Sequence, residues 1–193
     1  MNYAAAFPHP ESPRLSAIDS PRSWVMKIAY WMSKRMFGRV ISPMRYLYSR
    51  SSAAFWVSIR IWRSERKVKL PITTMRMIQY YTSHLNDCPF CQDISQAMSE
   101  KAGLELAEWT EYLHFESSTR FPPKEKALLA YLEAVNTTLT ASEEIFAELK
   151  RHWTDQEIVE ITWVNAVENY YNLMARPLGL QSDGLVDGMR GRI

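Results

Sequence analysis

The sequence predicts an all-α protein. Apolar residues recur at three- and four-residue spacing along most of the 193-residue chain, and no segment of useful length alternates apolar and polar residues as a strand would. Glycine is scarce, with only 6 residues, so long helices can continue without interruption. The length fits one domain with an extension, and 47% apolar residues can form a substantial core.

The chain begins without a helix signal. Three prolines in residues 1–19 interrupt helical hydrogen bonding, so we expect a loose leader there. Ser20 followed by Pro21 is typical of a helix start and Gly38 of a helix end, which predicts a helix to about Phe37. Its expected inward face comprises Val25, Ala29, Met32 and Met36, widened by Trp24, Ile28 and Trp31.

Proline also marks the next two helix starts, at residues 42–43 and 70–71, and Gly103 marks a later helix end. Beyond Gly103 we expect a shorter helix built around Trp109. The helices predicted for this part of the chain cover residues 43–66, with a break near 51–52, then 71–85, 88–102 and 104–114.

In the C-terminal half, the pair of prolines at 122–123 predicts another helix. Thr140 with Glu143 fits a capping box, and Thr154 with Glu157 fits a second one, which opens the longest helix, to about Leu178. The chain after that helix is polar, and we expect a surface tail. The predicted division is a leader with a basic amphipathic helix over 1–39, a helical domain over 40–182 and a tail over 183–193.

Charge is distributed unevenly along the chain. Residues 1–70 contain 13 Lys and Arg against 3 Asp and Glu, whereas residues 71–193 contain 10 against 18. A basic segment can bind nucleic acid or anionic lipid. We favour packing on the acidic body, its own or a neighbouring subunit's, and predict no nucleic-acid partner. Membrane association of the helix before Gly38 is the less favoured alternative.

The expected location is cytoplasmic. No window of 18 uncharged apolar residues could span a membrane, and the first residues do not follow the pattern of a secretory signal.

Two cysteines, Cys88 and Cys91, form a C-x-x-C motif. In a cytosolic protein this motif indicates redox activity or metal binding more than a structural bridge. We expect Asn86 or Asp87 to cap the next helix, which would place Cys88 in its first turn, where the helix dipole favours a thiolate. Either cysteine could be the attacking one. The alternative is a pair of buried structural thiols.

A zinc site requires four ligands, and the sequence has no second cysteine pair. We therefore predict no metal and no organic cofactor.

The cysteine segment 81–94 resembles the helix–C-x-x-C–helix core of the carboxymuconolactone decarboxylase and alkylhydroperoxidase D (AhpD) superfamily. Residues 121–131 are similar to its second helical hairpin, and residues 168–180 to its closing helix. The resemblance covers about residues 40–182. It implies an all-α AhpD-like bundle, a homo-oligomer and, where both cysteines are present, thiol-dependent peroxidase activity. The decarboxylase branch acts without a cysteine pair, which argues against that activity here.

The resemblance also implies a proton relay of Glu-x11-Cys-x-x-Cys-x3-His, and this sequence departs from it. Arg76 stands at the place of the Glu and Ser95 at the place of the His. Other groups would then have to supply the proton. The candidates that the sequence offers near the motif are His84, Asp93 and Ser95, with Arg76 as a charge that could stabilise a thiolate.

Three functions remain open at this point. In the first, Cys88 and Cys91 reduce a hydroperoxide, and an external dithiol restores them. In the second, the pair serves a thiol–disulfide oxidoreductase or redox sensor. In the third, the protein is a non-catalytic oligomeric scaffold of the same fold.

Overall fold

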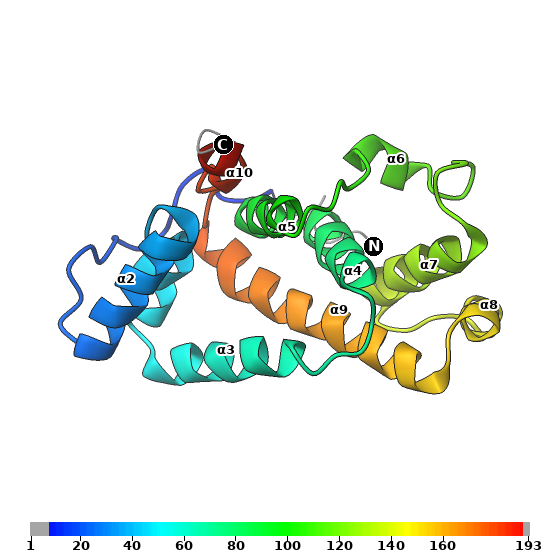
Figure 1. Cartoon of the computed structure of the whole chain (residues 1–193), viewed down its shortest axis with the longest axis horizontal. Coiled ribbons are helices and arrows are strands. Elements are labelled where there is room, and N and C mark those ends of the chain that lie inside the picture. Colours follow the sequence, from blue (N-terminus) through cyan, green and yellow to red (C-terminus); the bar gives the residue numbers. More distant parts are fainter. Residues whose placement is uncertain (1–7, 191–193) are drawn as a thin grey trace.

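The computed structural model describes residues 8–190, and every regular element in that range is helical. This confirms the predicted all-α class. The longest helix, α9 (Asp155–Ala175), runs through the middle of the molecule (Figure 1). Helices α4 (Ile72–Leu85) and α5 (Pro89–Lys101) pack on each other and on α9, and α3 (Ser52–Glu65) lies along the other side of α9.

Smaller elements complete the two ends of the molecule in Figure 1. One end holds the N-terminal helices and the chain's last helix, and the other holds the helices that follow α5. The remaining elements are α2 (Trp24–Phe37), the π-helical turn η1 (Met44–Tyr48), α6 (Trp109–Leu113), α7 (Pro123–Thr138), α8 (Glu143–His152), the 3-10 turn η2 (Arg176–Leu178) and α10 (Leu185–Arg190). Within the described residues, no helix is long and apolar enough to cross a membrane.

Several predicted helix boundaries are confirmed. Thr154 and Glu157 form the expected capping box at the start of α9. Gly38 ends α2 with a φ of 78°, a backbone conformation that favours glycine. Ser51 caps α3 at the predicted break.

Other predicted boundaries were wrong. Helix α2 begins at Trp24, after Ser23 rather than after Ser20. The N-cap of α8 is Ser142, whose hydroxyl accepts a hydrogen bond from the Ile145 amide, so Thr140 does not form the expected capping box. The reason lies just before it, where exposed Leu139 ends α7 with a φ of 63° and leaves residue 140 in the loop. Helix α6 is also shorter than the predicted 104–114.

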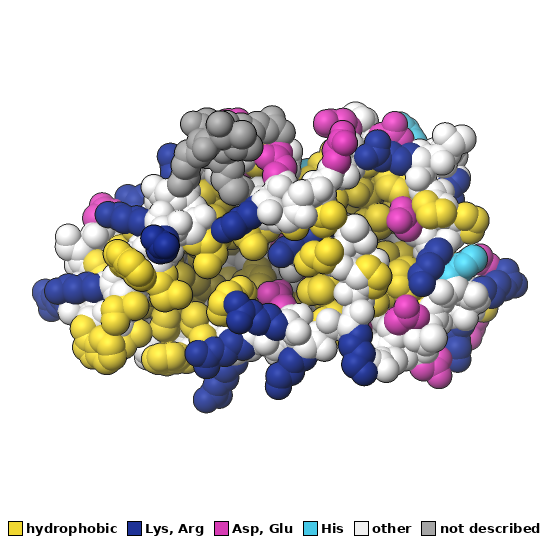
Figure 2. All heavy atoms as spheres, viewed as in Figure 1, with side chains coloured by type: hydrophobic (Ala, Val, Ile, Leu, Met, Phe, Trp, Pro, Cys, Tyr) yellow, Lys and Arg dark blue, Asp and Glu magenta, His cyan; other side chains and the backbone are white. Residues whose placement is uncertain are grey.

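The inward face of α2 differs from the prediction. Its buried residues include Tyr30 and Ser33, whereas Trp24, Trp31 and Met32 are exposed. Hydrogen bonds explain the rotation, because the Tyr30 hydroxyl donates to the Ile18 carbonyl and the Ser33 hydroxyl donates to the Arg39 carbonyl. The helix therefore packs on the body as predicted, but much of its predicted apolar face, including Trp24 and Met32, lines an open cavity rather than the closed core. Figure 2 shows this apolar surface, with Lys and Arg side chains around it.

Two apolar clusters form the core. One joins α4, α6, α7, α8 and α9 and includes Ile78, Leu128 and Ile161, each fully buried. The other joins α2, η1, α3 and α5 with the C-terminal segment, and it contains both cysteines. The cysteine pair thus lies in the part of the core that the N-terminal and C-terminal segments complete.

The expectation of a polar surface tail after Gly179 was wrong. Leu180 and Leu185 are buried, and α10 packs on α5. The reason is Asp93 in α5, whose carboxylate accepts hydrogen bonds from the backbone or hydroxyl groups of Ser182, Asp183, Leu185 and Val186. Such charge-assisted bonds fix the returning chain onto α5.

The leader is also held more closely than predicted. The Arg14 amide donates to the Leu178 carbonyl, and the Ile18 amide donates to the Arg45 carbonyl. A side chain in place of Gly179 would collide with the Ser12 carbonyl, at 2.3 Å from the added carbon, so this glycine permits the close approach of the leader. The division into residues 1–39, 40–182 and 183–193 stays a prediction.

Candidate functional site

The two cysteines form a disulfide at the amino end of α5, with their Cα atoms 5.3 Å apart. Cys88 is the N-cap residue, and its carbonyl accepts the first helical hydrogen bond, from the Gln92 amide. Cys91 follows one turn later. When the bond is reduced, both thiols therefore lie at the helix end whose partial positive charge favours a thiolate.

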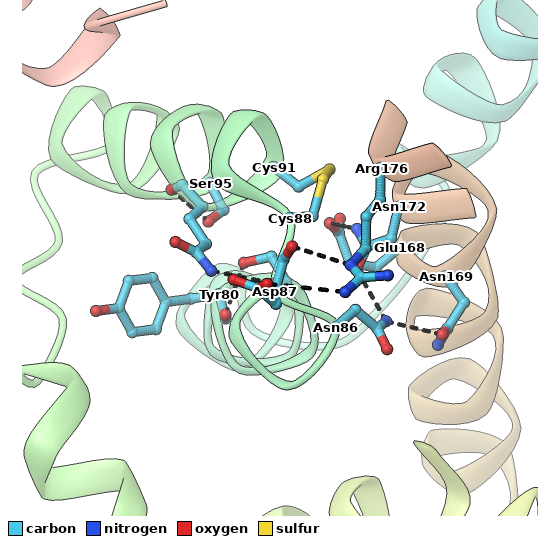
Figure 3. The surroundings of a disulfide bond; sticks show 12 residues. Tyr80, Asn86, Asp87, Cys88, Cys91, Ser95, Glu168, Asn169, Asn172 and Arg176 are labelled. Carbon is cyan, nitrogen blue, oxygen red and sulfur yellow. Dashed lines mark hydrogen bonds and ion pairs between the residues drawn. A yellow bond between two sulfur atoms is a disulfide. The ribbon is translucent and has the colours of Figure 1, made fainter. Parts of the chain in front are cut away.

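The expected capping by Asn86 or Asp87 was wrong. The Asn86 side chain donates instead to the side-chain oxygens of Asn169 and Asn172 in α9. Asp87 adopts a left-handed backbone with a φ of 47°, and its carbonyl accepts a hydrogen bond from Arg176. Asn86 thereby fixes the turn between α4 and α5 to α9, and Asp87 fixes it to η2, which together hold the disulfide in place (Figure 3).

An apolar cavity of about 540 Å³ reaches the disulfide. It lies among α2, η1, α3, α4, α5 and α9, and exposed Trp24 and Trp56 are among the residues at its outer rim. Cys91 lines this cavity and Cys88 does not. Cys88 is fully buried, and Cys91 is 2% exposed. A molecule in the cavity would therefore contact Cys91 rather than Cys88.

The two departures from the family's relay pattern meet at this cavity. Arg76 from α4 and Ser95 from α5 both line it together with Cys91. The Arg76 guanidinium donates to the Gln79 side chain, at 2.7 Å, and the Ser95 hydroxyl donates to the Gln92 carbonyl, at 3.0 Å. The two positions thus line the same cavity as Cys91, with an arginine and a hydroxyl where the resemblance implies a carboxylate and an imidazole.

His84 lies elsewhere. Its ring stacks on Trp109 with centroids 4.6 Å apart, and its Nδ1 lies 2.8 Å from the Tyr80 carbonyl. It is not among the residues that line the cavity. Burial lowers the pKa of His84, which favours a neutral ring. Its role as a proton donor stays a prediction that this position does not support.

The Asp93 carboxylate is also engaged in hydrogen bonds away from the cavity. Both of its oxygens accept hydrogen bonds from the C-terminal segment, as described above, and it is absent from the cavity lining. The structure places it as the group that fixes α10. A catalytic role for Asp93 stays a prediction without support from the geometry.

Sequence reasoning missed Glu168 of α9. This side chain is 6% exposed, lines the cavity with Cys91 and accepts a hydrogen bond from Asn172, at 2.6 Å. Burial raises the pKa of Glu168 to about 8. A signal was available in the sequence, because Glu168 falls on the buried register of α9, at helical spacing from Ile161, Val164 and Asn172.

A metal site is not apparent in this region. Among residues 8–190, no group of three or more His, Cys, Asp or Glu side chains is arranged to hold a metal ion. The groups at this site are the disulfide, the buried Glu168 carboxyl group, the Arg76 guanidinium and a large apolar wall.

Comparison with known proteins defines the fold. The Ralstonia eutropha peroxidase-related protein described as an alkylhydroperoxidase AhpD core superposes with a TM-score of 0.74 over 92% of this chain and 95% of its own, at 18% identity. The chain has the AhpD-like fold. The Agrobacterium tumefaciens protein ATU0492, of unknown function and named as a candidate antioxidant defence protein AhpD, is 27% identical over 70% of this chain and 94% of its own, with a TM-score of 0.63.

The same AhpD-like fold serves other chemistry. The debrominase Bmp8, solved with 2,3,4-tribromopyrrole, superposes with a TM-score of 0.75 over 93% of this chain and 99% of its own, at 12% identity. In sequence, the uncharacterized protein YnjA of Escherichia coli K12 is 23% identical over 169 residues, which cover 83% of this chain and 90% of YnjA. No family model matches the chain.

Proposed function

We propose that this protein is a member of the AhpD-like superfamily that reduces organic hydroperoxides with its Cys88–Cys91 pair. One observation carries the proposal. The disulfide lies at a helix amino end, and one of its two residues, Cys91, lines an apolar cavity of about 540 Å³. The peroxidase-related neighbours support it, and the proposal includes a cytoplasmic location, a homo-oligomer and an external dithiol as reductant.

The proposed cycle assigns different roles to the two cysteines. The Cys91 thiolate attacks the outer oxygen of the hydroperoxide, the O–O bond breaks, and the released alkoxide takes a proton to leave as an alcohol. Cys91 becomes a sulfenic acid. The Cys88 thiol then attacks that sulfur, forms the disulfide and releases water. An external dithiol reduces the disulfide and is itself oxidised to a disulfide.

The cavity wall favours an organic substrate over hydrogen peroxide. Its lining is mostly aliphatic and aromatic, with contributions from Met32, Phe55 and Ile94 among others. Such a wall stabilises an apolar body through the hydrophobic effect, while a small polar peroxide gains nothing from it.

The experiment follows cumene hydroperoxide consumption by the pre-reduced protein in the presence of dithiothreitol. We expect turnover by the wild type and none above the reagent background by Cys91→Ser. The matched control Cys88→Ser, pre-reduced and then freed of dithiothreitol, should consume one equivalent and stop, with a sulfenic acid on Cys91 that dimedone labels. Equal, slow peroxide loss in the wild type and in both variants would refute a peroxidase function.

A thiol–disulfide oxidoreductase or redox sensor remains the second candidate, because the same disulfide would serve it. The two are distinguished by the reduced protein's reaction with peroxide in single turnover. An oxidoreductase would exchange its disulfide with a dithiol readily, yet react with cumene hydroperoxide no faster than a free thiol does. A non-catalytic scaffold would do neither.

A further inference from the structure

A group of charged and polar side chains lies in the wall of this largely apolar cavity, which Arg63 of α3 and several hydroxyl groups also line. Glu65 comes from α3, Arg76 and Gln79 from α4, and Glu168 from α9, and all four line the cavity with Cys91. Buried charges are costly unless they are paired or hydrogen-bonded. Here the pairing is incomplete, since the buried Nε of Arg76 has no hydrogen-bond partner among residues 8–190.

Glu168 is the carboxyl group of this cluster that lies beside the sulfurs. In Figure 3 its carboxyl group is next to the disulfide, on the side of α9 that faces α5, and the structure places Glu168 and Cys91 in the wall of one cavity. Within the described chain, its carboxyl group accepts a hydrogen bond from Asn172 on one oxygen only, Oε1. The second oxygen is thus available to a proton on a sulfur or on a molecule in the cavity.

We propose that Glu168 is the acid–base group of this site, which takes the proton of the Cys91 thiol and gives it to the oxygen that leaves the substrate. The assignment rests on the proposed function. It places on α9 the role that the family's relay glutamate and histidine would have, since Arg76 and Ser95 replace them here.

The proton that Glu168 removes from Cys91 is the one that it later gives to the leaving group. Transfer of the thiol proton from Cys91 to the Glu168 carboxylate gives a thiolate and a carboxylic acid. The thiolate attacks the outer peroxide oxygen, the O–O bond breaks, and the carboxylic acid protonates the departing alkoxide. Glu168 is then a carboxylate again, Cys91 is a sulfenic acid, and the condensation with Cys88 releases water.

The electrostatic surroundings suit proton exchange with a thiol. Burial, together with the nearby Glu65, raises the pKa of Glu168, while the Asn172 hydrogen bond and the Arg76 charge oppose the shift, and the result is about 8. A free thiol has a pKa of about 8.5. Donor and acceptor of similar pKa exchange a proton at small cost. Tyr171 and Tyr48, also at the cavity, have raised pKa values and remain neutral near pH 8.

Arg76 and Glu65 act on this exchange through Glu168. The Arg76 guanidinium stabilises the carboxylate, and the carboxyl group of Glu65 destabilises it. Glu65 in turn accepts a hydrogen bond from Gln79, which also accepts one from Arg76. We therefore regard Arg76, Gln79 and Glu65 as positioning residues rather than as groups that touch the reacting atoms.

The test compares Glu168→Gln with the wild type in two assays. The first is the single-turnover reaction of the reduced protein with cumene hydroperoxide, where we expect a loss of roughly 10²-fold or more, as for removal of a general acid–base group. The second needs no substrate. It measures the rate of Cys91 alkylation by iodoacetamide against pH in a Cys88→Ser background, where loss of the neighbouring negative charge should move the midpoint to lower pH.

The outcomes separate this assignment from the proposed function. If Glu168→Gln changes neither the peroxide rate nor the alkylation midpoint while the wild type consumes peroxide, the assignment is overturned and the function stands. If the wild type does not consume peroxide but the midpoint still moves, the function fails and the proton coupling between Glu168 and Cys91 stands.

Three further variants guard against a folding artefact. Glu133→Gln, on the exposed side of α7, should leave both assays unchanged. Arg76→Gln removes a cation and should raise the alkylation midpoint, whereas Glu65→Gln removes a negative charge and should lower it. Shifts of the same sign in these last two would contradict an electrostatic coupling and indicate a general loosening of the cavity.

Discussion

Asp93→Asn tests how the C-terminal segment holds the redox helix. The carboxylate of Asp93 accepts hydrogen bonds at 2.8 to 3.3 Å from the Ser182 hydroxyl and from the amides of Asp183, Leu185 and Val186. Hydrogen bonds to a charged group contribute about 1.5–3 kcal/mol each. Adding all four contributions would overstate the loss of stability, because the C-terminal segment can detach and its amides can then bond to water.

The free energy needed to detach the C-terminal segment sets an upper limit on the stability that Asp93→Asn can remove. Detachment would expose Leu185, which is 1% exposed in the folded chain, at about 1.5–3 kcal/mol. It would also break the bonds from the Ser42 amide and hydroxyl to the Asp183 carboxylate. We therefore expect Asp93→Asn to lower the free energy of unfolding by about 3 kcal/mol, within the range of a broken buried network.

Urea unfolding followed by circular dichroism measures this change, and hydrogen exchange locates it. The amides of Asp183, Leu185 and Val186 should lose protection before those of α9. Asp155→Asn is the matched control, because its side chain is 85% exposed and its ion pair with Lys150 contributes little. A loss below about 1 kcal/mol, with these three amides still protected, would show that Asp93 does not fix the segment and would reopen a catalytic role for it.

The other predictions concern stability. Reduction of the disulfide in the folded protein should lower stability by about 2 kcal/mol, the chain-entropy value for so short a loop, as measured by the urea midpoint with and without dithiothreitol. Thr154→Ala should cost about 1 kcal/mol through the lost capping box, and an unchanged melting temperature would contradict that. Because the folded pKa of Glu168 is raised, the native state binds the extra proton, so stability should fall as pH rises from about 4.5 to about 8; Glu168→Gln should flatten this slope in pH-dependent unfolding. Because the folded pKa of His84 is lowered, stability should fall as pH drops below about 6.5, and His84→Gln should remove that loss.

Local signals in the sequence predicted most of the fold. Gly38 and the capping box at Thr154 each determine the backbone within one turn, so their effects can be predicted without a structure. The prediction failed where distant residues compete. The face of α2 is set by the bond from Tyr30 to Ile18, and the path after Gly179 is set by Asp93.

For the candidate site as well, local features were predictable from the sequence and distant contacts were not. The cysteine motif and the two departures from the relay pattern were visible as spacings, and all three positions meet at one cavity through Cys91, Arg76 and Ser95. Glu168 stands 77 residues beyond Cys91 in the numbering, so no motif connects them. Only the packing of α5 on α9 brings that carboxyl group to the sulfurs.

The bond from the Leu185 amide to Asp93 spans 92 positions of the chain. During synthesis on a ribosome, the cysteine helix therefore emerges long before the segment that fastens it. Until residues 182–186 leave the exit tunnel, both cysteines have been synthesised but the segment that covers their helix cannot yet fold onto it. Closing so long a loop is a late and entropically costly event. The interval is one in which a chaperone or a cellular thiol would find the cysteines accessible.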